Sequence, residues 1–304
     1  MKDPQRDLPR THLGLFPTPC YKLDAISAQY GRRIYIKRDD LNGVALGGNK
    51  VRKLEYLLAD ARNQGCDTVF TAGAAQSNHA MLTAACAARL GMRCVLFLKA
   101  RGVTARLGNL MLDELYGAEV RLIDTDRYAD IYDQMEQLEA ELAKEGHKCY
   151  AIPVGGSNPL GTVGYLSCVD EIAIQCPNAE HIVCAVGSGG TAAGLLLGAK
   201  LYLPGVRVTG VAVDPSPFEE IVPALAESAA RLLDCELALE EGDFRAPVHM
   251  GEGYGIPNPA DTPLIEELAR KEGILLDPIY TGKAWAGMLE LLRKGFFNGN
   301  GPLV

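Results

Sequence analysis

A lysine next to a glycine pair has the most distinctive chemistry in this sequence. The run Gly47-Gly48-Asn49-Lys50 precedes a helical pattern and is followed by Arg52 and Lys53. Asn49 is a suitable N-cap, which places Lys50 in the first helical turn, where the helix dipole disfavours a cation. The two neighbouring cations add repulsion. We therefore expect a lowered pKa and a neutral, nucleophilic amine at Lys50, although a solvated helix-start lysine explains these residues equally well.

A polar cluster follows the next predicted strand. Gln76, Ser77, Asn78 and His79 join that strand to a helix, so backbone N–H groups there can bind an anion such as a carboxylate. Ser77 and Asn78 can add side-chain hydrogen bonds. The alternatives are that Ser77 or Asn78 only caps the helix, and that His79 is a structural histidine.

A third cluster is rich in glycine and lies between a strand and a helix. Its small side chains leave backbone amides able to close around a phosphate at the helix start. The same run fits a GxGxxA dinucleotide fingerprint, with Asp214 after the next strand, so an NAD-dependent oxidoreductase is an alternative. The residues of this loop are Gly187, Ser188, Gly189, Gly190 and Thr191.

Two tyrosines near the end of the chain stand among glycines. Tyr254 lies in Gly253-Tyr254-Gly255, and Tyr280 precedes Thr281-Gly282. Their phenols could serve a ligand as acids or hydrogen-bond donors, although each tyrosine taken alone is as well explained by packing.

The elements that position these residues alternate between short apolar runs and amphipathic runs. This pattern predicts an α/β fold with mostly parallel sheet and helices on both faces, and the polar clusters fall at strand ends, where such folds bind ligands. The segment 234–253 is expected to be irregular. Predicted strands are 33–37, 68–71, 93–98, 119–123, 149–154, 181–186 and 207–213, and predicted helices are 50–63, 80–90, 105–116, 128–144, 162–175 and 191–201.

Composition excludes several classes of protein. The 304 residues carry a net charge of −8 without a basic run, which argues against nucleic-acid binding. No apolar stretch is long enough to span a membrane, and Met1–Arg10 lacks the apolar core of a signal peptide. The nine scattered cysteines favour a reducing, cytoplasmic location over disulfides, and the isolated histidines argue against a metal site.

Taken in order, these clusters resemble the tryptophan-synthase-β-like, fold-type II pyridoxal-phosphate enzymes. Within that group the chain is similar to the D-cysteine desulfhydrase and 1-aminocyclopropane-1-carboxylate deaminase family, from Phe16 to the last residue. The matching motifs are Phe16–Pro19, Ile36–Asp40, Gly47–Lys50, Arg52–Glu55, Gln76–His79, Ile152–Ser157 and Asp277-Pro278.

The resemblance implies a role for each cluster. Lys50 would join the cofactor, pyridoxal 5'-phosphate, as an imine and later shuttle the substrate α-proton. Lys53 and the Gly187–Thr191 loop would hold the phosphate. Asn78 would face the ring hydroxyl.

The substrate, a small amino acid, would occupy the other side of the cofactor. Ser77, with amides near Gln76 and Asn78, would bind the substrate carboxylate, and His79 would lie close by. Tyr254 and Tyr280 would line the substrate side of the site.

The resemblance also implies two three-layer α/β domains and a homodimer. Residues 1–49 and 161–304 would form a large cofactor-binding domain, and residues 50–160 a small one. Relatives extend beyond the strand that begins at Pro302-Leu303-Val304, so we expect a truncated chain; an inactive cofactor-binding protein is therefore another alternative.

Two positions bear on the choice of substrate. The deaminases have glutamate beside the pyridine nitrogen where this chain has Thr281, and a neutral partner there favours β-elimination of a good leaving group over opening of a cyclopropane. We therefore expect a lyase that converts D-cysteine to pyruvate, ammonia and sulfide. An L-cysteate sulfo-lyase and a 1-aminocyclopropane-1-carboxylate deaminase are the alternatives. Met81-Leu82 replaces the usual Arg-Gln near the carboxylate loop, which affects substrate preference.

Overall fold

The computed structural model describes residues 8–100, 103 and 105–304. Most of the segment Met1–Arg10, which was expected to lack the features of a signal peptide, lies outside the described residues. The chain divides into two compact units. Unit 1 comprises the described part of Met1–Phe16 together with Asp39–Gly164, and unit 2 comprises Pro17–Arg38 and Tyr165–Val304. The described residues up to Phe16, together with residues 39–49 and 161–164, belong to unit 1, whereas the sequence-based expectation assigned them to the large domain. The division into a cofactor-binding and a small domain stays a prediction.

Unit 1 contains a four-stranded sheet of parallel strands in the order β5-β4-β3-β6. Its strands are β3 (Thr68–Ala74), β4 (Arg93–Lys99), β5 (Glu119–Ile123) and β6 (Cys149–Ile152). Its helices are α2 (Lys50–Asn63), α3 (Asn78–Arg89), α4 (Asn109–Leu115), α5 (Tyr128–Lys144) and α6 (Pro159–Val163), with short 3-10 helices η1 (Asp39–Leu41) and η2 (Val154–Gly156).

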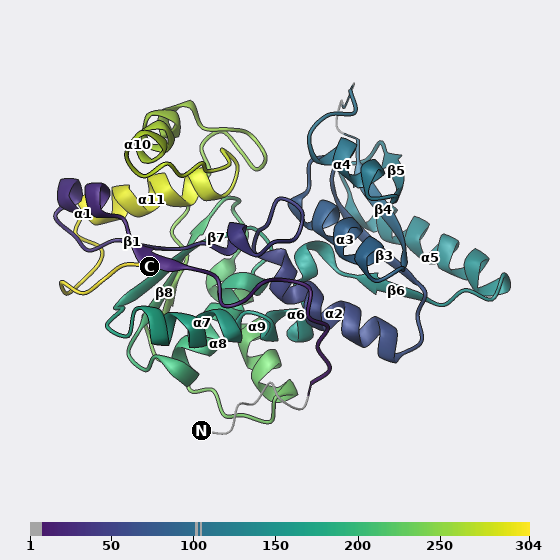
Figure 1. Cartoon of the computed structure of the whole chain (residues 1–304), viewed down its shortest axis with the longest axis horizontal. Helices are drawn as coiled ribbons and strands as arrows, with labels where there is room; N and C mark the ends of the chain where they lie inside the picture. The colour runs from purple at the N-terminus through teal and green to yellow at the C-terminus, as the bar shows by residue number, and fades with distance from the viewer. Residues whose placement is uncertain (1–7, 101–102, 104) are drawn as a thin grey trace. The chain divides into compact units, whose positions relative to one another are not determined.

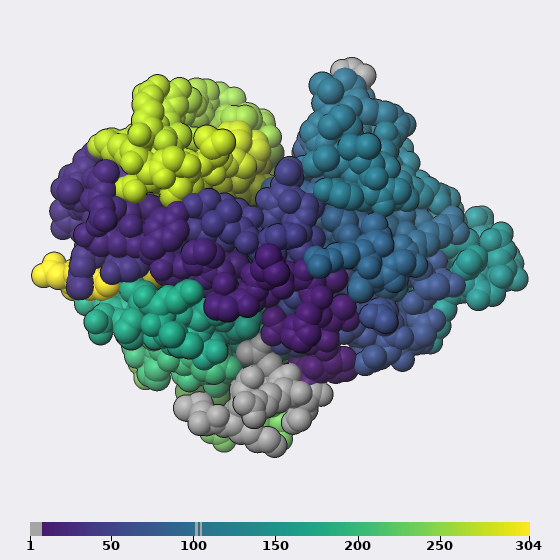
Figure 2. Space-filling view, viewed as in Figure 1, coloured from purple at the N-terminus to yellow at the C-terminus, as the bar shows by residue number. Residues whose placement is uncertain are grey.

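Alternating side chains make unit 1 a three-layer structure. On β3, Val69 packs with residues of α2 and α3, whereas Phe70 packs on the other face with residues of α5. On β4, Leu96 and Phe97 divide in the same way. Successive strand residues point to opposite faces, so a strand that is apolar at nearly every position must be covered on both faces. Figure 1 shows α3 and α5 with the sheet between them, and the end of α5 lies at the surface in Figure 2.

Unit 2 is built on a second parallel sheet, in the order β7-β8-β9, and an antiparallel pair, β1-β2. Its strands are β1 (Cys20–Lys22), β2 (Tyr35–Lys37), β7 (His181–Val186), β8 (Arg207–Ala212) and β9 (Phe244–Arg245). Its helices are α1 (Asp24–Tyr30), α7 (Leu166–Gln175), α8 (Gly190–Tyr202), α9 (Phe218–Leu232), α10 (Thr262–Glu272) and α11 (Thr281–Arg293), with η3 (Pro259–Asp261).

The segment Pro302–Val304 joins the two sheets of unit 2. Leu303 N donates to Arg33 O, and Tyr35 N donates to Leu303 O, while on the other side Val304 N donates to His181 O. Leu303 is fully buried with side chains of α1, α10 and α11, which cover one face of this sheet. Helices α7, α8 and α9 lie below β7 and β8 in Figure 1.

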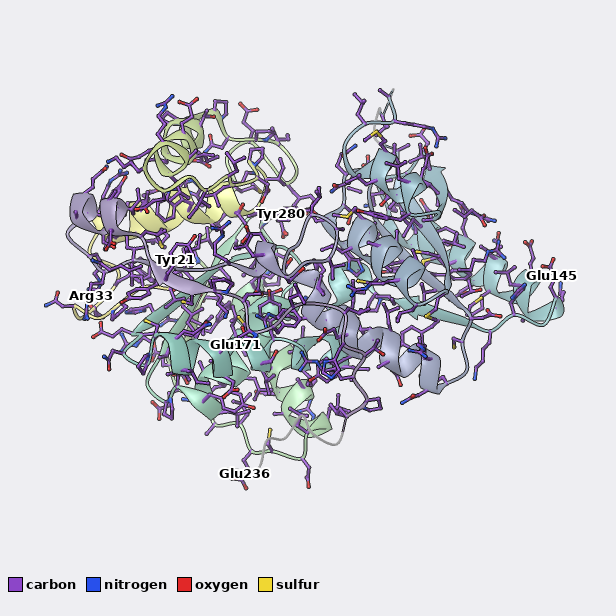
Figure 3. The ribbon with its side chains drawn as sticks, in the orientation of Figure 1. Tyr21, Arg33, Glu145, Glu171, Glu236 and Tyr280 are labelled. Atoms are coloured by element: carbon purple, nitrogen blue, oxygen red, sulfur yellow. The ribbon has the colours of Figure 1, made fainter. Side chains whose placement is uncertain are left out.

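An ion pair ties β2 to α7 within unit 2. Lys37 Nζ lies 2.5 Å from Glu171 Oε2, and both side chains are nearly buried. Glu171 Oε2 also accepts from Thr18 N (3.2 Å), so the carboxylate is held from two directions. Figure 3 labels Glu171 of α7 and also Tyr21, which lies on β1, the strand that pairs with β2.

The α/β fold with parallel sheets is confirmed, and the predicted bounds of α2, β5, α5 and β7 agree with the structure. Two predicted helices were wrong in part. The helix expected from residue 105 begins at Asn109, because Gly108 has a non-helical backbone with φ 60° and ψ −133°. The helix expected over 162–175 is interrupted near Gly164, where an added Cβ would lie 2.2 Å from Arg52 O. The segment 234–253 is irregular as expected, apart from β9.

No helix within the described ranges is long and apolar enough to cross a membrane. All nine cysteines are free. In the described part of the chain, no group of three or more His, Cys, Asp or Glu side chains could hold a metal ion.

Asp113 of α4 carries a prediction about stability. Its side chain is fully buried, and neither carboxyl oxygen has a hydrogen-bond partner among the described residues. Burial raises the pKa of this carboxyl from 3.8 to about 7. The folded state therefore holds the proton more tightly than the unfolded chain, so stability is lost as the pH rises between these two values.

The replacement Asp113→Asn removes this titration. The free energy of unfolding of the original protein, measured relative to the variant in urea, should fall between about pH 5 and pH 7 by at most about 1.4 kcal/mol per pH unit. A difference that stays constant over this range would show that Asp113 is not protonated in the folded state.

Candidate active site

Lys50 is the first residue of α2 and is partly buried. Burial lowers the pKa of its ammonium group from 10.5 to about 8. The turn before it is held by Gly48 N, which donates to Asp39 O (2.9 Å), and by Asn42 Nδ2, which donates to Asp39 O and Gly48 O. A substantial fraction of this amine is therefore neutral near physiological pH, as a nucleophile requires.

The pKa of Lys50 is lowered as expected, but the predicted cause was wrong. Arg52 makes a two-fold hydrogen bond to Asp39, with Nε to Oδ2 and Nη2 to Oδ1 both 2.8 Å, and its guanidinium stacks 4.2 Å from the Phe16 ring centroid. The adjacent carboxylate offsets its charge, so desolvation alone accounts for the shift. Asn49 occupies the N-cap position as predicted, but its side chain makes no cap hydrogen bond.

Lys53 and His79 lie against the Gly155–Ser157 turn. Lys53 is fully buried, and its Nζ donates to Gly155 O (3.1 Å) and Ser157 Oγ (3.2 Å). An added Cβ at Gly156 would lie 3.5 Å from both Lys53 Cβ and His79 Cε1. The predicted phosphate contact of Lys53 stays a prediction.

His79 is a core residue in this structure. Its side chain is buried, and Nε2 lies 2.9 Å from Thr71 Oγ1, which donates its own proton to Ile152 O. Burial, followed by the charges of Lys50 and Lys53, lowers the pKa of His79 well below its ordinary value. Thr71 thus joins β3 to β6 and holds the His79 ring, and the predicted contact of His79 with substrate stays a prediction.

The polar cluster Gln76–Asn78 lies at the start of α3. Ser77 is the N-cap, and its Oγ accepts from Ala80 N at 3.2 Å. This confirms the capping alternative without excluding a ligand, because the hydroxyl proton can still be donated. Asn78 Oδ1 accepts from Asn109 Nδ2 at 2.7 Å, which ties the cluster to the start of α4.

In unit 2, the Gly187–Thr191 loop leads from β7 into α8. Gly189 has φ 83°, a conformation that strains other residues, and an added Cβ there would lie 3.2 Å from Ile221 Cγ2. At Gly187 an added Cβ would lie 3.3 Å from Tyr280 Cε1. The loop is therefore narrow, ends at a helix N-terminus, and lies against one of the two candidate tyrosines.

The structure brings Tyr254 and Tyr280 together. Their hydroxyl oxygens are 2.6 Å apart, and their rings meet edge to face with centroids 6.1 Å apart. The buried Lys283, whose pKa burial lowers, donates to Met250 O (2.8 Å) and Gly253 O (2.9 Å) and so ties the loop before Tyr254 to α11. Tyr280 lies directly before α11, where Figure 3 labels it.

Thr281 is held by Asp277. Its Oγ1 donates to Asp277 Oδ2 (2.5 Å) and accepts from Asp277 N (2.9 Å), and its backbone N also donates to Asp277 Oδ2. The other carboxyl oxygen accepts from Ile279 N (2.9 Å) and Tyr280 N (2.7 Å). Since its proton is already donated, Thr281 Oγ1 can serve a further group only as an acceptor.

Three residues have contacts in this geometry for which no role was predicted from the sequence: Asp277, Lys283 and Asn109. Aspartate before the start of a helical run is a recognised helix-start signal, so the capping role of Asp277 could have been predicted. A buried lysine and an asparagine inside a predicted helix leave no such signal, because their partners lie about 30 residues away along the chain.

Replacing Asp277 should weaken the start of α11. Asp277→Ala removes acceptors from three backbone N–H groups and one hydroxyl, which should reduce the free energy of unfolding by about 1–3 kcal/mol. The single tryptophan, Trp285, lies in α11, so its fluorescence in urea reports on this helix. Asp277→Asn, which keeps one carboxamide acceptor, should lose less. Equal stability of all three proteins would refute the capping role.

Comparison with known proteins gives the family. The model of the family described as "Pyridoxal-phosphate dependent enzyme" matches residues 11–304. D-cysteine desulfhydrases of Salmonella newport (strain SL254) and Salmonella paratyphi A are each 41% identical to the chain over 310 residues, which cover 97% of this chain and 92% of theirs. A solved structure described as an "ACC deaminase homologue" has a TM-score of 0.92 and 39% identity, and covers 99% of this chain and 91% of that one.

The residues present fit the cofactor of this family. Pyridoxal phosphate needs an amine to join its aldehyde and amides to receive its phosphate. Lys50 supplies an amine with a lowered pKa, and the loop that ends at Thr191 supplies a narrow turn at the N-terminus of the 13-residue helix α8. The family match spans this loop and nearly the whole chain, which argues against the NAD-dependent alternative. The chain belongs to the pyridoxal-phosphate-dependent enzymes of fold type II.

Proposed function

We propose that this enzyme is a lyase that removes sulfide from D-cysteine by β-elimination, with pyruvate and ammonia as the other products. The observation that carries the proposal is the 41% identity to D-cysteine desulfhydrases along 97% of the chain. The alternatives, a sulfo-lyase acting on L-cysteate and a deaminase acting on 1-aminocyclopropane-1-carboxylate, use the same kind of site.

Bound pyridoxal phosphate would supply an electron sink for the electron pair left when the substrate Cα–H bond breaks. Lys50 would hold the cofactor and then accept the α-proton at Nζ, a step that its lowered pKa supports. Lys53 and the Gly187–Thr191 loop would bind the phosphate. The network that holds Lys53 to Gly155 and Ser157 fixes where its ammonium group lies.

Ser77 would bind the substrate carboxylate. Its cap bond to Ala80 N uses a lone pair of Oγ, so its proton can be donated to the carboxylate. The first backbone amides of α3, near Gln76 and Asn78, would add to this site, because the N-terminus of a 12-residue helix favours an anion.

The phenol pair Tyr254–Tyr280 would face the substrate side. One of the two hydroxyls, whose oxygens are 2.6 Å apart, donates to the other, and a phenol can act as an acid or hydrogen-bond donor toward a leaving sulfur or a carboxylate. This assignment rests on the resemblance and on the closeness of the pair.

The choice of D-cysteine over a cyclopropane is supported by Thr281. Its hydroxyl donates to Asp277 Oδ2, so toward a pyridine nitrogen it would be a neutral acceptor. A neutral acceptor stabilises a protonated ring less than a carboxylate does, which suits a substrate with a good leaving group such as sulfide. A cyclopropane substrate has no such leaving group.

We also propose a homodimer, by likeness to the family, and a cytoplasmic location, which the nine free cysteines support. Sedimentation of the purified enzyme tests the first of these.

A substrate panel tests the proposed function. Purified enzyme with added cofactor should release pyruvate and sulfide from D-cysteine faster than keto acid from L-cysteine, L-cysteate, D-serine or 1-aminocyclopropane-1-carboxylate. Lys50→Ala should lower turnover by about 10²-fold or more, because the proton acceptor is lost. Inactivity on every substrate, with cofactor bound, would favour the inactive cofactor-binding alternative, and a preference for another substrate would replace D-cysteine.

The lowered pKa of Lys50 predicts how cofactor capture depends on pH. Only the neutral amine attacks the aldehyde, so the rate at which the cofactor-free protein captures pyridoxal phosphate should rise with pH and level off above about pH 8. For N-α-acetyl-lysine as the control, the rate should keep rising to about pH 10. A protein rate that follows the control would show that the Lys50 amine is not desolvated.

A further inference from the structure

Three amide side chains link the start of α3 to the start of α4, and we call Gln76, Asn78 and Asn109 the amide cluster. Gln76 Nε2 donates to Leu107 O (2.9 Å), and Gln76 Oε1 accepts from Asn109 N (2.9 Å). Asn109 Nδ2 donates to Gln76 O (3.0 Å) and to Asn78 Oδ1 (2.7 Å). All these residues belong to unit 1.

Backbone groups fix which way these amides face. The oxygen and nitrogen of a carboxamide have nearly the same shape, so its orientation follows from its partners. Gln76 meets a backbone N–H, which can only donate, and the carbonyl of Leu107, which can only accept. Its orientation is therefore determined without reference to any other side chain.

The same reasoning extends from Asn109 to Asn78. The carbonyl of Gln76 can only accept, so the group of Asn109 that faces it must be the NH₂. The second hydrogen of this NH₂ is directed at Asn78, which must therefore present its oxygen. The Asn78 NH₂ is left at the other edge of the planar carboxamide, where it can only donate.

We propose that Asn109 is a positioning residue, which turns the Asn78 side chain so that its NH₂ faces the ring oxygen of pyridoxal phosphate. This inference rests on the proposed function and on the role that the family resemblance implies for Asn78, whose side chain would face the ring hydroxyl. A deprotonated ring oxygen only accepts hydrogen bonds, so it requires a donor from Asn78 and is repelled by the amide oxygen.

The start of α3 and the start of α4 lie close enough together to hold the Asn78 side chain in this orientation. Gly108 has φ 60°, and an added Cβ there would lie 2.5 Å from Gln76 Oε1, so only glycine permits the contact between Gln76 and the start of α4. Asn109 is partly buried although Gln76 and Asn78 are exposed. The cluster therefore rests on Asn109 as its least accessible member.

Isosteric replacement of Asn109 tests the proposal. Asn109→Asp places an oxygen where the NH₂ was, so Asn78 must turn its own NH₂ toward the new carboxylate and its oxygen toward the cofactor. We expect the Kd for pyridoxal phosphate to rise at least about tenfold, the size expected for a lost hydrogen bond to a charged group. Asn109→Ala, which only frees Asn78 to rotate, should raise Kd less, by about three-fold.

An optical titration gives a readout independent of turnover. When the ring oxygen loses its donor, it should hold the proton that it shares with the Lys50 nitrogen more tightly. The midpoint pH of the change in the visible absorption spectrum of the bound cofactor should therefore be higher in Asn109→Asp. Gln137→Glu, an amide-to-carboxylate change at an exposed position of α5, is the matched control and should leave both the Kd and this pH unchanged.

A double-mutant cycle separates positioning from mere support of α4. In an Asn78→Ala background, Asn109→Asp should change Kd less than about two-fold, because there is no amide left to turn. The same loss in both backgrounds, or an unchanged Kd and titration in Asn109→Asp alone, would overturn the inference while leaving the proposed function intact. An original protein that shows no Lys50-dependent visible absorption with pyridoxal phosphate would overturn both.

Discussion

Burial of one amine at the start of α2 is the constraint on which the chemistry depends. A lysine in water holds its proton through the physiological range, whereas desolvation disfavours the ammonium form. At Lys50 this effect lowers the pKa to about 8 without help from neighbouring charges. The pairing of Arg52 with Asp39 and the hydrogen bonds of Lys53 to the Gly155–Ser157 turn let two further cations lie close by in fixed positions.

The other candidate groups share one structural device, the start of a helix. Ser77 caps α3, Asp277 binds the first N–H groups of α11, and the Gly187–Thr191 loop opens α8. Helix starts leave N–H groups without intrahelical partners, so each of these places can either be closed by a side chain or receive an anion. At α11 the aspartate closes the helix, and at α3 a single serine oxygen does so in part, which leaves amides for a carboxylate.

Much of the fold could be predicted from the sequence, because apolar periodicity records burial directly. The bounds of α2 and α5 follow from their apolar positions, and the nearly continuous apolar run of β4 indicates a strand covered on both faces. The break before Asn109 could not be predicted in the same way, since it depends on the close contact between Gly108 and Gln76.

Candidate site residues stand out in the sequence, whereas the contacts that act on them do not, and their roles stay predictions. Lys50 and the pair Tyr254–Tyr280 stand out by type and by neighbouring glycines, and the structure places the two hydroxyls in contact. The predicted cause of the lowered pKa of Lys50 was wrong, because the sequence shows that Arg52 is nearby but does not show that Arg52 pairs with Asp39. Asn109 was missed since its role depends on hydrogen bonds to residues 31 and 33 positions earlier.

The most direct test of the account is where the cofactor is attached. Borohydride reduction of the enzyme loaded with pyridoxal phosphate, followed by proteolysis and mass spectrometry, reports the modified lysine. We predict a single modified site at Lys50. Attachment at Lys53 or Lys283, or the absence of any modified peptide, would contradict the assignment of Lys50 as the residue that holds the cofactor.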